Sequence, residues 1–574
     1  MAEIRTNPNL ANPQLCQFSS SNIRLVPEIR LRAEYFGGLV YDTRNGNTLE
    51  VDKGAFQLLN SIKARTVNVD DLVKFLDRHK IVKYSDKSLP ATLEKLFEFN
   101  IIERCRQTPS HPALTDKRAG TSPWLSAPET VHWAVTYRCS ENCPDCYARR
   151  FSFDNTELDN RDALNLIDKV ADWGVFQLAI GGGEPFARRD LPEIVNHAAN
   201  QGLTVHITTG KLHIEQRILE SVSGSIKSLQ IGIRPNDLLG PDAKGSLKGI
   251  RNLVSAARNL DISPGANLIL TKSTVQKLPG IVERLVNSGL NRIVLLRYKP
   301  PASIDRWKAE NPGSDQISQT HERIGRILRK NPQLNMRVDC SLSFIQRYLP
   351  ESMARRVGIK GCVAADRILA LAPDGSAFPC SQLIHPSYHV GNLLHMDPKQ
   401  MWDQSKVLRR YRSFRTKKSF THSWCGICMS KNTCGGCRVF AGDGLGGDPG
   451  CPAPLVPPLT RLGKIGRSLD LAEYLDKYGI ISVAEYMNRY GVGQVRAIKE
   501  LNASQSTVST TGKSAKRKKD TYIISANEDP ILAIQNDIGY TPAGFPYAPY
   551  EQIAEWIQDP LYLEGYPAWI KESG

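Results

Sequence analysis

The sequence predicts an α/β protein whose central part is a partly closed barrel of six strand and helix units. Three observations support this prediction. Apolar strand-like runs alternate with amphipathic helical stretches from about residue 131 to residue 330. Three strand-like runs and then three helical stretches come before them, which is typical of a winged-helix-like domain. Residues 340–455 follow, rich in glycine and proline and holding eight of the thirteen cysteines.

A chain of 574 residues is too long for one hydrophobic core, so several domains are expected. We expect a tail at 1–28, a first domain at 29–106, a linker at 107–128, the barrel at 129–335, the cysteine-rich extension at 336–455, a helical segment at 456–505, a basic linker at 506–520 and a C-terminal segment of unknown role at 521–574.

In the first domain, the helical stretches repeat apolar residues at i, i+3 and i+4, and the strand-like runs are separated by turn residues such as Arg44–Asn47. The expected strands lie at 29–31, 38–41 and 48–51, and the expected helices at 53–63, 69–77 and 89–99.

The barrel strands are expected at 132–136, 177–180, 204–208, 229–233, 266–270 and 292–296. In a barrel of this kind the chemistry lies at the C-terminal ends of the strands. The two motifs described below each follow such an end.

Composition limits the classes of function. No apolar run approaches the roughly 18 residues that span a bilayer, and the N-terminus lacks the apolar stretch of a secretory signal, so a cytoplasmic protein is expected. Cysteines are kept reduced there, which favours metal or catalytic roles. The net charge of +16 favours an anionic partner, but the run Lys513–Lys519 is typical of a solvated linker. Residues 483–499 fit either a DNA-binding helix-turn-helix or a pair of helices that serves only for packing. Nucleic-acid binding is not expected, because helical pairs are common in proteins of many functions.

Three cysteines lie within eight residues after the first barrel strand: Cys139, Cys143 and Cys146, spaced Cys-x3-Cys-x2-Cys. Three thiolates can ligate three irons of a cubane cluster and leave the fourth iron open. The alternative is a zinc knuckle. A structural zinc site needs four ligands, and neither Ser140 nor Asp145 is a usual one.

A second motif, Gly181–Pro185, follows the next strand, 35 residues after Cys146. With both motifs in this order, the sequence resembles the radical S-adenosylmethionine (SAM) enzymes, whose core is a partial (β/α)6 barrel of the TIM type. The resemblance implies a [4Fe–4S] cluster whose open iron binds SAM and generates a 5′-deoxyadenosyl radical. It implies that Gly181, Gly182, Gly183 and Glu184 hold the SAM amino group, with Thr208, Thr209, Asn267 and Arg297 as further candidates. Many members of that family have Thr-Asn-Gly at the position where this chain has Thr209, Gly210 and Lys211.

The later cysteines resemble the SPASM extension of radical SAM maturases, although one spacing, within Cys434–Arg438, is a residue shorter than usual. The resemblance implies one or two auxiliary [4Fe–4S] clusters. One would be held by Cys425, Cys428, Cys434 and Cys451, the other by Cys362, Cys380 and Cys437, with either an open iron or a further ligand such as Cys340. A zinc ribbon is the alternative. Cys16 and Cys105 are expected to be ordinary thiols.

The first domain resembles the PqqD-like element that recognises the leader of a precursor peptide by adding it as a strand to a sheet edge. The three parts together imply a maturase of ribosomally made peptides that forms crosslinks, epimerises residues or excises tyramine. Gly181–Phe186 and Leu295–Pro301 resemble segments of the maturases of nitrile-hydratase-like leader peptides, the group that includes the spliceases. Expected partners are a precursor peptide and a flavodoxin or ferredoxin. The alternatives are a cofactor-biosynthetic enzyme, for instance on tetrapyrroles, and a DNA-binding iron–sulfur regulator.

Overall fold

The structure is a computed structural model that describes residues 18, 21–79, 81, 88–113, 122–141, 143–150, 157–299, 301, 303–312, 314–348, 361–417, 420, 425, 434–441, 448, 451, 539–540 and 546–547. The segments expected at 456–505 and 506–520, the helix-turn-helix candidate, Cys16 and Cys428 lie outside these residues. Of the expected segment 521–574, only the short pair β17 (Gly539–Tyr540) and β18 (Pro546–Tyr547) is described.

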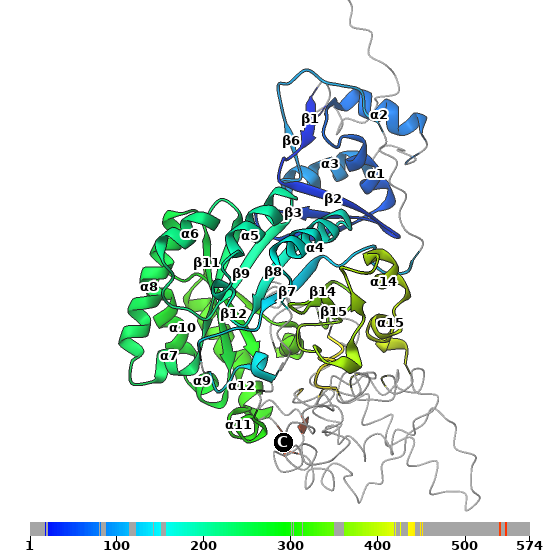
Figure 1. Cartoon of the computed structure of the whole chain (residues 1–574). Helices are drawn as coiled ribbons and strands as arrows, with labels where there is room; N and C mark the ends of the chain where they lie inside the picture. The colour runs from blue at the N-terminus through cyan, green and yellow to red at the C-terminus, as the bar shows by residue number, and fades with distance from the viewer. Residues whose placement is uncertain are drawn as a thin grey trace, which may run out of the picture.

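The first domain contains the three expected strands and three expected helices. Its first sheet is antiparallel, in the order β2-β3-β4, with helices packed beside it (Figure 1). The elements are β2 (Ile29–Glu34), β3 (Gly37–Asp42), β4 (Asn47–Asp52), α1 (Lys53–Ser61), α2 (Val69–Arg78) and α3 (Ser88–Glu98). Side chains cap two of the helices: Asp52 accepts a hydrogen bond from Ala55 N, and Asn68 accepts one from Asp70 N.

A second small sheet in this domain was not predicted. β1 (Asn22–Leu25) lies between β5 (Thr66–Asn68) and β6 (Ile102–Arg104) and pairs antiparallel with both. Ile23 is fully buried in the core of the domain. The expected tail at 1–28 is therefore wrong for these residues, because β1 is an integral strand of the first domain.

The α/β class of the central part is confirmed. Seven parallel strands lie side by side in chain order, and the seventh was not predicted. The strands are β7 (Thr130–Thr136), β8 (Gln177–Gly182), β9 (Thr204–Thr209), β10 (Ile226–Ile233), β11 (Ser263–Leu270), β12 (Arg292–Arg297) and β13 (Asn335–Val338). The helices between them are α4 (Asn160–Asp172), α5 (Leu191–Asn200), α6 (Gln216–Val222), α7 (Pro235–Leu239), α8 (Ala243–Asn259), α9 (Lys272–Gln276), α10 (Leu278–Asn287), α11 (Ile304–Glu310) and α12 (Ser314–Lys330).

The cysteine-rich part continues the barrel sheet instead of forming a separate unit. β14 (Ile368–Leu371) pairs parallel with β7, and β15 (Ser376–Phe378) and β16 (Gly391–Asn392) follow it as antiparallel strands. Helices α14 (Pro398–Gln404) and α15 (Lys406–Arg412) lie beside this extension (Figure 1). β14 thereby covers the edge of β7. The strand before the three-cysteine loop and the strands of the cysteine-rich part therefore belong to one sheet.

The two faces of the barrel sheet differ in burial. Along β9, buried Val205, Ile207 and Thr209 alternate with half-buried His206 and exposed Thr208. Since successive side chains of a strand point to opposite faces, the buried set packs against the helices and the other set lines the inside of the barrel. This alternation decides which candidate residues can reach a ligand inside the barrel.

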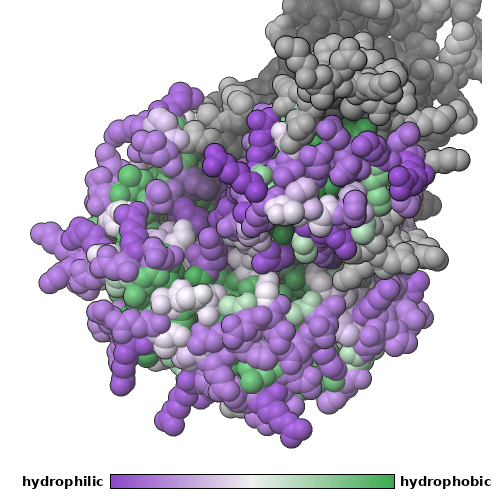
Figure 2. Space-filling model, turned by 90° about the horizontal axis from the view of Figure 1, so that it is seen from above, coloured by the Kyte–Doolittle hydropathy of each residue, from purple (hydrophilic) through white to green (hydrophobic). Residues whose placement is uncertain are grey.

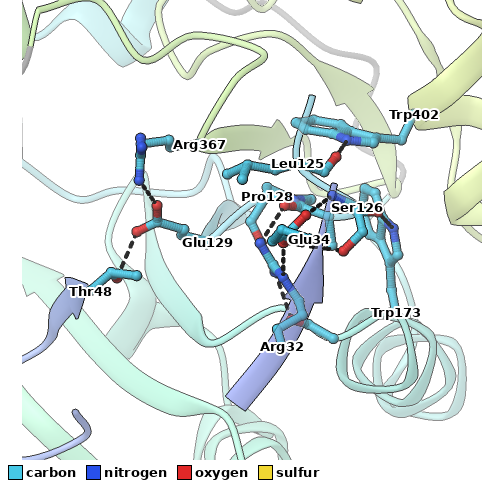
Figure 3. Close-up of polar contacts among 12 residues, drawn as sticks. Arg32, Glu34, Thr48, Leu125, Ser126, Pro128, Glu129, Trp173, Arg367 and Trp402 are labelled. Carbon is cyan, nitrogen blue, oxygen red and sulfur yellow. Dashed lines mark hydrogen bonds and ion pairs between the residues drawn. The ribbon is translucent and has the colours of Figure 1, made fainter. Parts of the chain in front are cut away.

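The first domain packs on the end of the barrel where the strands begin (Figures 1 and 3). Arg32 of β2 donates hydrogen bonds to the carbonyl oxygens of Ala127, Pro128 and Gly174 at 2.8–2.9 Å. It also pairs with Glu34 at 2.7 Å, and Glu34 accepts a hydrogen bond from Ser126 N. Residues 122–128, expected to be linker, are therefore held firmly between the domains.

A second set of contacts at this junction involves Glu129, just before β7. Its carboxylate accepts a hydrogen bond from Thr48 of β4 at 2.8 Å and also bonds Arg367, just before β14 (Figure 3). Trp402 donates to Leu125 O at 2.7 Å. The first domain, the barrel and the cysteine-rich extension thus meet at one junction, on the opposite end of the barrel from the two motifs.

Replacing Glu34 with alanine is expected to lower the free energy of unfolding by about 3–5 kcal/mol, because buried Arg32 would lose its carboxylate partner. Glu103→Ala is the matched control, since the Arg24–Glu103 pair in the same domain is about one third exposed and contributes at most about 1 kcal/mol. Thermal melting of both variants measures the loss of stability. Equal melting temperatures for the two variants would contradict the prediction.

Among the described residues, no helix is long and apolar enough to cross a membrane. The face of the molecule seen in Figure 2 is mostly hydrophilic where its residues are described, with small apolar areas between polar side chains.

Candidate active site and auxiliary cluster site

The cysteine loop directly follows β7. Cys139 is exposed, Cys143 and Cys146 are half-buried, and Cys146 N donates to Cys143 O at 3.3 Å. The loop ends in a short 3-10 helix, Tyr147–Arg150. All three thiols therefore lie at the C-terminal edge of the sheet, as the barrel fold requires of an active site.

Side chains from distant strands hold this loop in place, and sequence reasoning missed them. Arg234, just after β10, donates to the Glu141 carboxylate at 2.6 Å and to Cys143 Sγ at 3.6 Å. Tyr298 and Arg306 both donate to Asp145, at 2.7 Å. Asp145 is thus engaged by the protein and is not a fourth ligand in this arrangement.

The surroundings of the thiols affect their protonation. Burial raises the pKa of Cys139, and the nearby Glu184, Cys143 and Cys146 raise it further. Burial also raises the pKa of Cys146. Thiols clustered in this way favour the neutral form unless a metal centre stabilises the thiolates, so cluster binding would release protons.

The glycine motif brings the end of β8 onto the cysteine loop. Gly183 N donates to Thr136 O at 2.7 Å, and Glu184 N donates to Arg138 O at 2.9 Å. A Cβ on Gly183 would lie 2.4 Å from Arg138 O, and one on Gly182, whose φ is +114°, would lie 2.3 Å from Thr136 O. A Cβ on Gly181 would meet nothing within 4 Å. Two glycines therefore allow backbone packing, while Gly181 borders open space inside the barrel.

Glu184 connects the ends of β8 and β9. Its buried carboxylate accepts hydrogen bonds from the Thr209 hydroxyl at 2.9 Å, from Gly210 N at 2.9 Å and from Phe186 N at 3.2 Å. Burial raises the pKa of Glu184, and these donors act in the opposite direction. The structure thus gives Glu184 three protein donors at the site where the sequence predicts the SAM amino group.

The remaining SAM candidates divide by strand face. Thr208 is exposed on the inner face of β9, and Asn267 is half-buried on the inner face of β11, so both can reach a ligand. Thr209 and Arg297 lie on the buried face. Thr209 bonds Glu184, and Arg297 pairs with Asp448 at 2.9 Å. Strand alternation places both side chains on the buried face with protein partners, so contact of either residue with SAM stays a prediction.

The cysteine loop also touches the cysteine-rich extension. Tyr137, Cys146 and Tyr147 pack against a small buried cluster that includes Ala370 of β14 and Phe378 of β15. Cys380 lies two residues after Phe378. The first cysteine loop therefore packs against the strands that lie just before Cys380.

An ion pair lies between these groups, and sequence reasoning missed it. Lys299 Nζ is 2.8 Å from Asp339 Oδ2. Burial lowers the pKa of Lys299, but Asp339 outweighs it and the net pKa is raised, with Tyr147 and Cys340 also acting on it. This ion pair therefore lies near Tyr147, which directly follows the first cysteine loop, and near Cys340.

The later cysteines form two groups. Cys362, Cys380 and Cys437 are buried, and each raises the pKa of the nearby Cys340 thiol. In the other group, Cys425 Sγ accepts from Asp448 N at 3.2 Å, Cys434 Sγ accepts from Gly436 N at 3.4 Å, and Cys451 N donates to Asp448 O. In the described part of the chain, no three His, Cys, Asp or Glu side chains converge as they would around a single metal ion. Thiolates of a cubane cluster bind different irons and need not converge on one point.

Comparison with known proteins identifies these two regions. Residues 133–234 match the radical SAM superfamily, and residues 362–434 match SPASM, an iron–sulfur cluster-binding domain. The chain is a radical SAM enzyme with a SPASM domain. The two domains imply [4Fe–4S] clusters and SAM as the cofactors of this enzyme.

Curated relatives of this radical SAM enzyme include the AdoMet-dependent heme synthase of Methanosarcina barkeri, 25% identical over 356 residues that cover 57% of this chain and 97% of the relative. The mycofactocin maturase MftC of Mycobacterium ulcerans is 26% identical over 339 residues, covering 57% and 88%. A crystal structure of Streptococcus suis SuiB bound to the precursor peptide SuiA has a TM-score of 0.53 and 19% identity, covering 72% of this chain and 95% of SuiB. The likeness to SuiB shows a shared fold.

Proposed function

We propose that this radical SAM enzyme is a maturase that modifies a ribosomally made precursor peptide. The observation that carries the proposal is the combination of a three-thiol loop, a SPASM domain and a first domain with an unpaired strand edge. Relatives named as peptide maturases, such as MftC, support it. A flavodoxin or ferredoxin in the cytoplasm is the proposed source of electrons.

The chain's own residues prepare the site. When bound, the cluster and SAM supply a 5′-deoxyadenosyl radical that abstracts a hydrogen atom from the substrate. Gly182 and Gly183 fix the cysteine loop against β8, and Glu184 joins β8 to β9. Thr208 and Asn267 point to the inside of the barrel, where they would orient polar groups of SAM. Lys299 and Asp339 form an ion pair near Tyr147 and Cys340, at the ends of the strands.

We propose that the first domain binds the leader of the precursor peptide along β4. Among the described strands, β4 pairs only with β3, so its other edge can accept an added strand. The likeness to SuiB covers 72% of this chain, which exceeds the share of residues 129–455, 327 of 574 residues. The shared fold therefore extends beyond the barrel and the SPASM domain, which supports a counterpart of the first domain in a protein that binds a precursor peptide.

The position of the first domain sets a minimum peptide length. It packs where the barrel strands begin, whereas the cysteine loop lies where they end. Strands of six to eight residues span roughly 20–26 Å. Since an extended residue covers at most about 3.6 Å, at least about six to eight residues must separate the bound leader from the modified residue.

A Leu49→Asp variant is expected to bind the leader about tenfold more weakly. Leu49 lies on β4, the proposed leader site, and 37% of its surface is exposed, so its apolar side chain can contact the added strand. The measurement is fluorescence polarisation of a labelled leader peptide encoded beside this gene. Met396→Asp is the matched control, since Met396 is 39% exposed in the SPASM domain and should leave binding unchanged. Equal binding by both variants would count against β4 as the leader site.

The function itself is tested by incubating reduced, iron-loaded protein with SAM and that precursor peptide, and then measuring the peptide by mass spectrometry. Loss of hydrogen indicates a crosslink, loss of tyramine indicates the splicease reaction, and an unchanged mass with an altered amino-acid configuration indicates epimerisation. An unmodified peptide together with active SAM cleavage would contradict the proposal.

A cofactor-biosynthetic reaction on a tetrapyrrole is the second candidate, because a heme synthase is among the relatives. Consumption of a tetrapyrrole in the same assay, with the peptide unchanged, would favour it. The DNA-binding regulator is not proposed further, since the family that the chain matches is one of enzymes.

A further inference from the structure

One side of the SPASM domain is strongly basic. It is formed by α15 and by the short 3-10 helix that follows, Phe414–Thr416. Residues 404–424 contain no aspartate or glutamate, and their basic residues are Lys406, Arg409, Arg410, Arg412, Arg415, Lys417 and Lys418. Four of these have exposed side chains in the structure, and we name them the basic face: Lys406, Arg409, Arg410 and Lys417.

The helical pattern of α15 separates the basic face from the core. Leu408 and Tyr411 are buried, whereas Lys406, Arg409 and Arg410 are exposed. These three residues have the spacing i, i+3 and i+4, so they are neighbours on the helix surface and their like charges repel one another. Among the ion pairs between described residues, none involves Lys406 or Arg409. The positive charge is therefore concentrated on one side of the helix.

The helix dipole does not account for this charge. Basic residues are favourable in the last turn of a helix, where Arg409 and Arg410 lie, but Lys406 is the first residue of α15, where a positive charge is unfavourable. The two carboxylates that border the segment have partners outside the basic face. Asp403 accepts a hydrogen bond from Trp124 Nε1 at 2.8 Å, and Asp366 lies 3.9 Å from Arg367 Nε.

The other side of the same segment packs on cysteine-bearing parts of the SPASM domain. Phe414 belongs to a small buried cluster that includes Cys425. Arg412 Nε donates to Ala365 O at 2.6 Å, three residues after Cys362. Cys425 and Cys362 are predicted ligands of the two auxiliary clusters. The segment that presents the basic face is thus in direct contact with parts of the chain that carry cysteines of both groups.

We propose that the basic face is the docking surface of an acidic one-electron carrier of the flavodoxin class. The inference rests on the proposed function, in which such a protein supplies the electrons, and it names the surface where that protein binds. A cluster of positive charges attracts an acidic protein and raises the rate of association. The anionic flavin hydroquinone of the carrier gives up one electron and becomes the neutral semiquinone, which keeps its proton, and an auxiliary cluster gains the electron. No covalent bond forms or breaks.

The test replaces Lys406, Arg409 and Arg410 together with glutamate in the iron-loaded full chain. Flavodoxin hydroquinone is mixed with this variant or with the unaltered chain, without SAM or peptide, and its oxidation is followed by stopped-flow absorbance. At about 0.01 M salt, where charges act over about 30 Å, the charge-reversed variant is expected to react at least about tenfold more slowly. The rate of the unaltered chain is expected to fall towards that of the variant when the salt is raised to about 1 M.

A matched control reverses three charges on another exposed helix. Lys244, Lys248 and Arg251 are exposed on α8, which lies on the far side of the barrel from α15 (Figure 1). The variant with glutamate at these three positions has the same net charge as the first and should keep most of the rate. Equal rates in the two variants would overturn the proposal, and so would a rate of the unaltered chain that does not depend on salt.

A second measurement separates this surface from the proposed function. Binding of oxidised flavodoxin to each protein is measured by calorimetry at low salt, and SAM cleavage is measured with dithionite in place of flavodoxin. We expect weaker binding only in the Lys406, Arg409 and Arg410 variant, with iron content and dithionite-driven SAM cleavage alike in all three proteins. Equal affinity for flavodoxin in both variants would overturn the docking surface alone, whereas an unmodified precursor peptide would contradict the maturase function.

Discussion

A Gly183→Ala variant is expected to lose about four irons per chain and at least about 100-fold of its SAM cleavage activity. The added Cβ would lie 2.4 Å from Arg138 O and 2.7 Å from the backbone of Tyr137. Backbone atoms cannot move aside as a flexible side chain can, so the cysteine loop must shift. Iron analysis of the anaerobically purified protein and the rate of 5′-deoxyadenosine formation measure the effect.

Gly181→Ala is the matched control for this variant. Its Cβ would meet no atom within 4 Å, so the fold and the iron content should stay unchanged. Because Gly181 borders the inside of the barrel, we expect a weaker affinity for SAM instead. The account of the glycine motif would be contradicted by equal iron loss in both variants, or by full iron and activity in Gly183→Ala.

Asp448→Ala is expected to destabilise the protein by about 3–5 kcal/mol, the second large effect. The substitution leaves the Arg297 charge buried without its carboxylate, and it removes the acceptor of Cys437 N. Iron held by the SPASM domain should be lost along with stability. The two measurements are thermal melting and iron analysis. Both use a chain in which Cys139, Cys143 and Cys146 are replaced by alanine, so that the radical SAM cluster is absent.

Glu215→Ala is the control for Asp448→Ala. The Arg217–Glu215 pair has a similar distance of 2.7 Å, but its side chains are 81% and 55% exposed, so its contribution is at most about 1 kcal/mol. An Asp448→Ala protein that melts like the Glu215→Ala protein would show that the buried pair does not hold the SPASM domain to the barrel.

Much of the fold is predictable from local sequence patterns. The six barrel strands have apolar runs that alternate with helical stretches, and α1 and α2 begin directly after the capping residues Asp52 and Asn68. The small sheet of β1, β5 and β6 is not predictable in this way. Each of these strands has only three or four residues, and Ile23 pairs with Arg104, 81 positions further along the chain.

The candidate site is predictable where chemistry depends on spacing and not where it depends on distant contacts. The cysteine and glycine motifs are local, and they lie together at the strand ends. Thr209 and Arg297 lie at the expected strand ends but on the buried face, and their partners Glu184 and Asp448 are distant in sequence. Arg234 and Arg306 reach the cysteine loop from 91 and 161 residues away, and no local pattern marks them.

SAM cleavage by this chain depends on the three-thiol loop. The most direct test is to incubate reduced, iron-loaded protein anaerobically with SAM and to measure 5′-deoxyadenosine by liquid chromatography and mass spectrometry, with Cys146→Ala as the control. We predict 5′-deoxyadenosine from the unaltered chain and none above background from Cys146→Ala. Equal, background amounts from both proteins at full iron loading of the unaltered chain would contradict the claim.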